Sequence, residues 1–95
     1  MNKKTGELER LRRQVEAVDK TIIKSLSKRV KLVEDIGRYK FAHNISFLDK
    51  TRRDNLLAVW TASGKSLRLP AKLVRDIFSS IHRHSLEIEK TIKKN

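Results

Sequence analysis

The feature that most constrains this chain is a long apolar repeat in its N-terminal half, which no proline interrupts. Successive apolar residues follow one another at steps of three or four, which is the period of an α-helix. These residues are Leu8, Leu11, Val15, Val18, Ile22, Leu26, Val30, Val33 and Ile36. We therefore predict one helix from Leu8 to about Lys40, roughly 33 residues and about 50 Å long.

A helix of this length does not fit inside a compact monomer of this size, whose radius of gyration is only about 12 Å. We expect a second chain to cover the part of the apolar stripe that one chain leaves exposed. The alternative is a helix that breaks near Gly37 or Ser25–Ser27 and folds back on itself.

The next segment predicts a turn and then a short second helix. The pair His43-Asn44 interrupts the repeat and favours a turn. Ser46–Asp49 has the S-x-x-D form that often begins a helix. The apolar residues of this second helix are Leu48, Leu56, Leu57 and Trp60.

A loop at Thr61–Leu69, which contains a Ser-Gly pair, is expected to separate that helix from a third one. Pro70 suits a first helical position, and the apolar residues that follow it again show the helical period. No segment shows the alternation of a strand. We predict an all-α fold of three helices, long, short and long, in one domain over residues 1–95, with residues 1–6 disordered.

The composition narrows the classes of function. The formal net charge is +12, from 23 Lys+Arg against 11 Asp+Glu. This favours an anionic partner, such as nucleic acid, acidic lipid or a small polyanion, although a solvated basic surface explains many of these residues equally well. The absence of cysteine excludes disulfides and thiolate metal sites. No apolar run approaches the ~20 residues of a membrane span and no signal-peptide pattern opens the chain, so we expect a cytoplasmic protein.

Several polar residues stand where the helical repeats place core residues. Arg29 and Lys40 share one face of the first helix, about 16 Å apart along its axis, and can hold a small anion between them. Ser85 and Glu89 lie one turn apart on the apolar face of the third helix. A buried carboxylate needs a partner or a proton, so Glu89 either pairs with a basic residue or serves a site.

Arg12 lies at the edge of the stripe on the first helix, with Asp19 as a candidate ion-pair partner. Arg12 faces about 100° away from Arg29 and lies roughly 25 Å from it on a straight helix. These two arginines therefore serve one small ligand only if Arg12 comes from a second chain.

The remaining polar candidates lie on the two shorter helices. Asp49 and Arg52 share a face, as in an ordinary surface ion pair, whereas Arg53 points about 100° away from Arg52. His82 and His84 do not face each other on a helix, so we treat the histidines as surface residues and predict no metal site. The chain also lacks a Ser-His-Asp order, a glycine-rich phosphate loop and paired catalytic carboxylates.

Taken in order and at their spacing, these residues resemble the all-helical chorismate mutases, which are small intertwined homodimers of three-helix chains. The resemblance extends from about Leu8 to Glu89. It is carried by Leu11-Arg12, Asp19, Arg29, Ile36-Gly37, Lys40, Asp49-Lys50-Thr51-Arg52, Ser85 and Glu89.

The resemblance implies an isomerase of the shikimate pathway that converts chorismate to prephenate for phenylalanine and tyrosine biosynthesis, without a cofactor. It implies that Arg29 and the partner chain's Arg12 bind the substrate carboxylates, and that Lys40 contacts a carboxylate and the ether oxygen. Arg52 would support carboxylate binding. A pericyclic rearrangement needs no nucleophile; it needs the dianion held in a compact shape, with positive groups beside the breaking ether bond.

The resemblance also assigns three residues that contact other parts of the substrate. Asp49 would accept a hydrogen bond from the C4 hydroxyl, Ser85 would bind a carboxylate, and Glu89 would donate to the ether oxygen. Two positions depart from the family pattern. Many members have glutamine in place of Glu89, so this carboxyl group must be protonated to donate. Arg53 stands where members often carry a carboxylate, so its role in substrate choice stays open.

Three alternatives remain from the sequence. An isochorismate-pyruvate lyase, or a related chorismate-type enzyme, would have the same scaffold. A basic helical module would bind nucleic acid through its net positive charge, and this binding would weaken strongly with salt. That nucleic-acid-binding alternative gives no reason for Ser85 and Glu89 to face inward. The third alternative is a helical dimerisation or regulatory domain that has lost activity, in which Arg29→Ala would change no catalytic rate.

Overall fold

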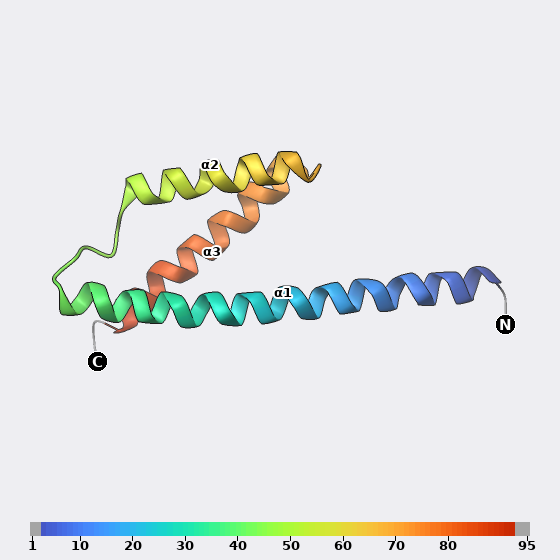
Figure 1. The fold of residues 1–95 in the computed structure, drawn as a ribbon, viewed down its shortest axis with the longest axis horizontal. Coiled ribbons are helices and arrows are strands. Elements are labelled where there is room, and N and C mark those ends of the chain that lie inside the picture. Colours follow the sequence, from blue (N-terminus) through green and yellow to red (C-terminus); the bar gives the residue numbers. More distant parts are fainter. Residues whose placement is uncertain (1–2, 93–95) are drawn as a thin grey trace. The chain divides into compact units, whose positions relative to one another are not determined.

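The computed structural model describes residues 3–92 of the chain, and all its regular structure is helical in this range (Figure 1). The helices are α1 (Lys3–Ala42), α2 (Lys50–Ser66) and α3 (Ala71–Ile92). The predicted order of long, short and long helices is thus confirmed. None of the described helices is long and apolar enough to cross a membrane. Helix α1 begins inside the segment 1–6 that was expected to be disordered, and residues 1–2 lie outside the described range.

The chain forms two compact units, Met1–Leu32 and Val33–Asn95. The first unit is the N-terminal part of α1, and its apolar stripe faces solvent. Leu11 and Val18 of this stripe, for example, are 44 % and 59 % exposed. Helix α1 is continuous through Ser25–Ser27 and Gly37, so the predicted alternative of a broken helix is wrong.

The second unit has a small apolar interior, where α2 packs along α3. Val74 and Phe78 of α3 are buried, as is Val33 at the start of the unit. The ring of Trp60 meets Phe78 edge to face, with centroids 5.4 Å apart, an arrangement that aromatic pairs favour. Val74 and Phe78 of the α3 repeat therefore face the interior, as the helical period predicts, whereas Ile77 is 44 % exposed.

The connection between α1 and α2 contains the turn predicted at His43-Asn44. Asn44 has a positive φ of 55°. The N–H of Ile45 donates to the carbonyl of Lys40 at 2.8 Å, and that of Asn44 donates to Phe41 at 3.4 Å. This pair of bonds is the Schellman motif, which satisfies the last carbonyls of a helix.

Helix α2 begins later than the sequence predicted. Its N-cap is Asp49, whose Oδ1 accepts a 2.9 Å hydrogen bond from the N–H of Arg52. Ser46 instead bonds within the loop, where its hydroxyl donates to the carbonyl of Leu48 at 3.2 Å. The predicted start at Ser46 is therefore wrong by three residues. Asp49, the last residue of the S-x-x-D motif, supplies the cap in place of Ser46.

The loop predicted over Thr61–Leu69 is also wrong, because α2 continues through Gly64 to Ser66. A Cβ at Gly64 would lie 2.6 Å from Cγ2 of Val74, so the missing side chain allows α2 and α3 to approach closely. The helix ends in a second Schellman motif, in which Leu69 N–H donates to the Gly64 carbonyl at 2.8 Å. Pro70 directly precedes α3, one residue before the position predicted for it.

The histidines differ from one another in their surroundings. The imidazole of His82 stacks on Phe78 with centroids 5.8 Å apart, and its Nε2 is buried, so the prediction of a surface residue is wrong there. His84 is exposed, as predicted. No group of residues in the described range is arranged to hold a metal ion.

Candidate active site

The centre of the candidate site is an ion pair between α1 and α3 within the second unit. Lys40 Nζ lies 3.1 Å from Glu89 Oε1, and the two side chains are only 20 % and 7 % exposed. Lys40 Nζ also donates to the carbonyl of Phe47 at 3.3 Å. The prediction that Glu89 faces inward is confirmed, and its partner among the many cations is Lys40.

The C-terminal ends of two helices position this pair. Lys40 lies in the last turn of α1, and its own carbonyl is held by the Schellman motif. The chain that leaves α1 then brings the Phe47 carbonyl to the Lys40 ammonium. Glu89 lies in the last turn of α3, on the apolar face that the repeat of this helix defines. Gly37 of α1 faces Glu89, and a Cβ built there would lie 3.3 Å from the Glu89 Cα.

Ser85 lies one turn before Glu89 on α3 and is half-buried. Its hydroxyl donates to the Ile81 carbonyl of its own helix at 2.8 Å. A hydroxyl has a single proton to donate, so Ser85 must turn away from Ile81 before it donates to an anion. The sequence prediction of an inward-facing hydroxyl near Glu89 agrees with this placement.

The start of α2 contributes polar groups of a different kind. The Asp49 carboxylate caps the helix, so its bond to Arg52 goes to the backbone N–H rather than to the guanidinium of the predicted ion pair. Arg53 turns to Asp54, where Nη2 lies 3.2 Å from Oδ1. This neighbouring carboxylate was not considered in the sequence prediction, and it gives Arg53 a local ion pair on an exposed surface.

The two arginines of the first unit have different environments. Arg12 is exposed and its Nη1 lies 3.3 Å from Glu9 Oε1, so the predicted pairing with Asp19 is wrong. Arg29 is half-buried, and this burial lowers the pKa of its guanidinium below the ordinary value. An arginine stays charged at neutral pH even so, which means that Arg29 keeps a partly desolvated positive charge.

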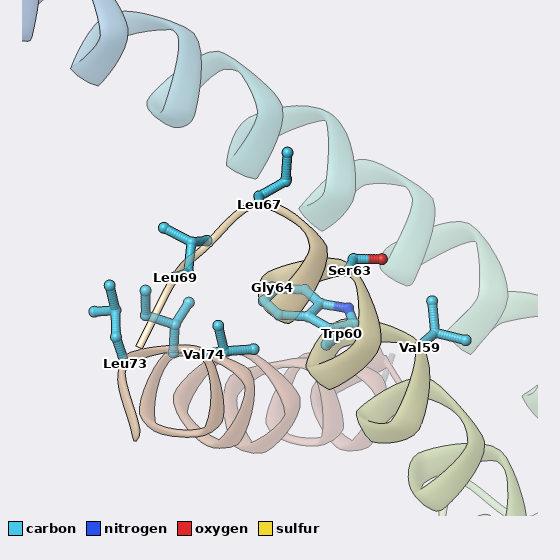
Figure 2. Close-up of a pocket in the computed structure, with 9 residues that line it drawn as sticks. Val59, Trp60, Ser63, Gly64, Leu67, Leu69, Leu73 and Val74 are labelled. Carbon is cyan, nitrogen blue, oxygen red and sulfur yellow. The ribbon is translucent and has the colours of Figure 1, made fainter. Parts of the chain in front are cut away.

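Among the hollows of the second unit, two differ clearly in chemistry. One, of about 440 Å³, is next to the ion pair and is lined by Lys40, Phe41, Asn44, Ile45, Ser46 and Phe47. The other, of about 310 Å³, lies where α2 turns into α3 and is lined by Val59, Trp60, Ser63, Gly64, Leu67, Leu69, Leu73, Val74 and Ile77. Figure 2 shows the side chains that line this second hollow, which are apolar apart from the Ser63 oxygen and the Trp60 nitrogen. We call this hollow the α2–α3 groove.

The α2–α3 groove is not the chemical site, because it offers almost only carbon atoms to a ligand. The surroundings of Lys40 and Glu89 offer an ammonium, a carboxyl group and the Ser85 hydroxyl instead. Of these groups, the ammonium and the hydroxyl are of the kind that can donate hydrogen bonds to an anion. No nucleophile among them is paired with a general base, which fits chemistry by binding and electrostatics rather than by covalent catalysis.

The comparisons with known proteins agree with this inventory. Residues 11–90, which include every candidate residue from Arg12 to Glu89, match the model of the family described as chorismate mutase type II. The chain belongs to this chorismate mutase family. The T-protein of Enterobacter agglomerans is 30 % identical over 84 residues, which are 88 % of this chain. The chain spans only 22 % of the length of that relative. The all-helical fold is the one expected of chorismate mutase type II.

Proposed function

We propose that this protein is a chorismate mutase that converts chorismate to prephenate by an intramolecular Claisen rearrangement. The observation that carries the proposal is the enclosed pair of Lys40 and Glu89, which lies inside the range that matches the family. The reaction breaks an ether bond and forms a carbon–carbon bond within one molecule. The enzyme therefore has to hold a dianion in a compact conformation and stabilise the charge that develops on the ether oxygen.

In this mechanism the cations provide most of the binding. Arg29 and the partner subunit's Arg12 hold the two substrate carboxylates, with support from Arg52. Guanidinium groups suit this task because each grips a carboxylate with two parallel hydrogen bonds. Lys40 contacts a carboxylate and the ether oxygen, so its ammonium lies where negative charge grows in the transition state.

The other groups orient the substrate around the ether bond. Glu89, when protonated, donates to the ether oxygen. Ser85 donates to a carboxylate once its hydroxyl leaves Ile81, and Asp49 accepts from the C4 hydroxyl. Asp49 keeps one oxygen on the backbone of α2, which fixes its position at the helix start.

The proposed enzyme is a homodimer in which each site contains Arg12 from the other chain. Support comes from the exposed apolar stripe of α1 and from the apolar α2–α3 groove. Large apolar surfaces of this kind are typical of interaction sites. We place the enzyme in the cytoplasm, in the shikimate pathway to phenylalanine and tyrosine.

The decisive experiment follows chorismate consumption with identification of the product. We expect prephenate from the wild-type protein, and a loss of kcat/KM of at least about 100-fold in Arg29→Ala, the usual effect of removing one charge-stabilising donor. Arg13→Ala is the matched control, because Arg13 is an exposed arginine of the same helix without a proposed role. Its activity should match the wild type.

The same assay separates the alternatives. Formation of pyruvate and salicylate from isochorismate, without prephenate from chorismate, would identify a lyase and contradict the proposal. No turnover of either compound, together with DNA binding that weakens steeply with salt, would indicate a nucleic-acid-binding module.

A further inference from the structure

We propose that Gly37 is a positioning residue, whose missing side chain brings the α3 backbone close enough to α1 for Glu89 to reach Lys40. This inference rests on the proposed function only for its effect on activity. Gly37 is buried and lies three residues before Lys40, so both residues are on the same face of α1. The paired Glu89 lies directly opposite this face.

The distances around Gly37 show what an added side chain would meet. A Cβ at this position would lie 3.0 Å from Cδ1 of Ile92, 3.3 Å from Cα of Glu89 and 3.4 Å from Cγ of Glu89. The Ile92 contact is with the free end of a flexible side chain, which rotates away easily. The Glu89 contact is with backbone, so it is relieved only if α3 itself moves by a few tenths of an ångström.

A movement of this size matters for the ion pair. The ion pair between Lys40 Nζ and Glu89 Oε1 is 3.1 Å long, already slightly longer than the typical charge-assisted hydrogen bond of about 2.7–2.9 Å. A displacement of Glu89 lengthens this bond and also moves the carboxyl group that the proposed mechanism places on the ether oxygen. Rates fall steeply when a reacting group is misplaced, by up to about 100-fold for 1 Å.

Helix preference alone does not explain a glycine here. Glycine is among the least favourable residues inside a helix, and alanine would favour α1 more strongly. Gly6, in the same helix, has nothing within 4 Å of the place where its Cβ would be. The two glycines therefore form a matched pair: both substitutions to alanine raise helix preference, but only Gly37→Ala meets Glu89.

The first test does not depend on any catalytic activity. Lys40→Met, Glu89→Gln and the double variant, unfolded with urea at one fixed protomer concentration, give the coupling between the pair. We expect this coupling to fall by about half or more when the same cycle is repeated in the Gly37→Ala background. In the Gly6→Ala background it should be unchanged. An equal coupling in all three backgrounds would overturn the proposal, whether or not the protein is a chorismate mutase.

The second test uses turnover of chorismate. We expect Gly37→Ala to lower kcat about tenfold with a smaller change in KM, and Gly6→Ala to leave both unchanged. Adding Glu89→Ala, which removes the donor, to Gly37→Ala should then cost less than Glu89→Ala costs alone, because the misplaced carboxyl group has already lost its role. Fully additive losses would contradict an action through Glu89.

A third variant separates the two contacts of Gly37. Ile92→Val removes Cδ1 and so relieves the 3.0 Å contact, but it leaves the Glu89 backbone where it is. In the double variant Gly37→Ala/Ile92→Val we expect the ion-pair coupling and kcat to stay low. Full recovery of both would show that the side chain of Ile92, and not the position of Glu89, transmits the effect. Circular dichroism of each variant confirms that its helices are intact.

Discussion

At the scale of single residues, the carboxyl group of Glu89 is the most demanding feature of the candidate site. An ionised carboxylate accepts hydrogen bonds but has none to donate, whereas an ether oxygen only accepts them. In the ligand-free protein the Glu89 carboxyl group pairs with the Lys40 ammonium, 3.1 Å away. The proposed reaction needs a protonated carboxyl group that donates to the ether oxygen, so Glu89 has to exchange its partner when the substrate binds.

The need for a protonated carboxyl group gives a prediction about pH. Because only protonated Glu89 donates to the ether oxygen, kcat/KM for chorismate should fall as the pH rises through the titration of this group. In Glu89→Gln the amide donates at every pH, so most of that fall should disappear. A pH–rate profile of the two proteins between about pH 4 and 9 measures the effect. An unchanged profile in the variant would remove Glu89 from this role.

Part of this arrangement of site residues could be predicted from the sequence. The spacing of Glu89 from Ile92 and Ser85 was enough to predict an inward-facing carboxylate, because helical periodicity is a local property. Its partner was not predictable, since any of 23 basic residues fits the charge requirement. The exposed pair of Arg53 and Asp54 was missed because neighbours in sequence on a helix rarely face each other.

At the scale of the elements, α1 and α2 end in the same backbone motif, but with different residues at its left-handed position. Asn44 and Arg68 both adopt a positive φ, of 55° and 61°, at the left-handed position of a Schellman motif. Asparagine tolerates this conformation well, whereas arginine pays the steric cost of its Cβ. At the end of α2, Arg68 is therefore held in a backbone conformation that is unfavourable for a residue with a Cβ.

We predict that Arg68→Gly stabilises the protein by about 1 kcal/mol, because glycine has no Cβ to crowd the following carbonyl. Asn44→Gly is the control, and its effect should be clearly smaller. Urea unfolding at a fixed protomer concentration compares the two variants. Equal effects at both positions would mean that the strain at Arg68 is relieved in some other way.

The element boundaries also show why part of the fold could not be predicted. Local periodicity gave α1 and α3, and the left-handed turn at Asn44 was visible because asparagine favours it. The extension of α2 through Gly64 was missed because the reason for this glycine is the side chain of Val74, on another helix. The turn at Arg68 was not predicted because arginine does not favour the left-handed conformation that it adopts there, with a φ of 61°.

At the scale of the whole molecule, two apolar surfaces are left open by a single chain. The first is the stripe of α1 in the first unit, and the second is the α2–α3 groove in the second unit. The length of the first helix led to the prediction of a second chain from the sequence, and that remains a prediction. The groove was not predicted, because it exists only where α2 and α3 meet.

We predict that Val18→Lys, in the middle of the stripe, weakens the proposed dimer by at least about tenfold, because it buries a charge in an apolar interface. Ala17→Lys adds the same charge at an exposed position of α1 that lies off the stripe, and should leave assembly unchanged. Sedimentation or light scattering over a range of protein concentrations measures both variants. A monomeric wild-type protein that turns over chorismate would contradict the shared site.

The ion pair of Lys40 and Glu89 also means that the site contains a competitor of its own. In the proposed mechanism a carboxylate of the substrate needs the same lysine that a carboxylate of the protein already occupies. A dianion that pairs with Lys40 therefore has to displace Glu89 from an ion pair that is mostly shielded from solvent. Without a ligand, the protein's own carboxylate thus closes this lysine to anions, and every anion that binds there must first break the pair between α1 and α3.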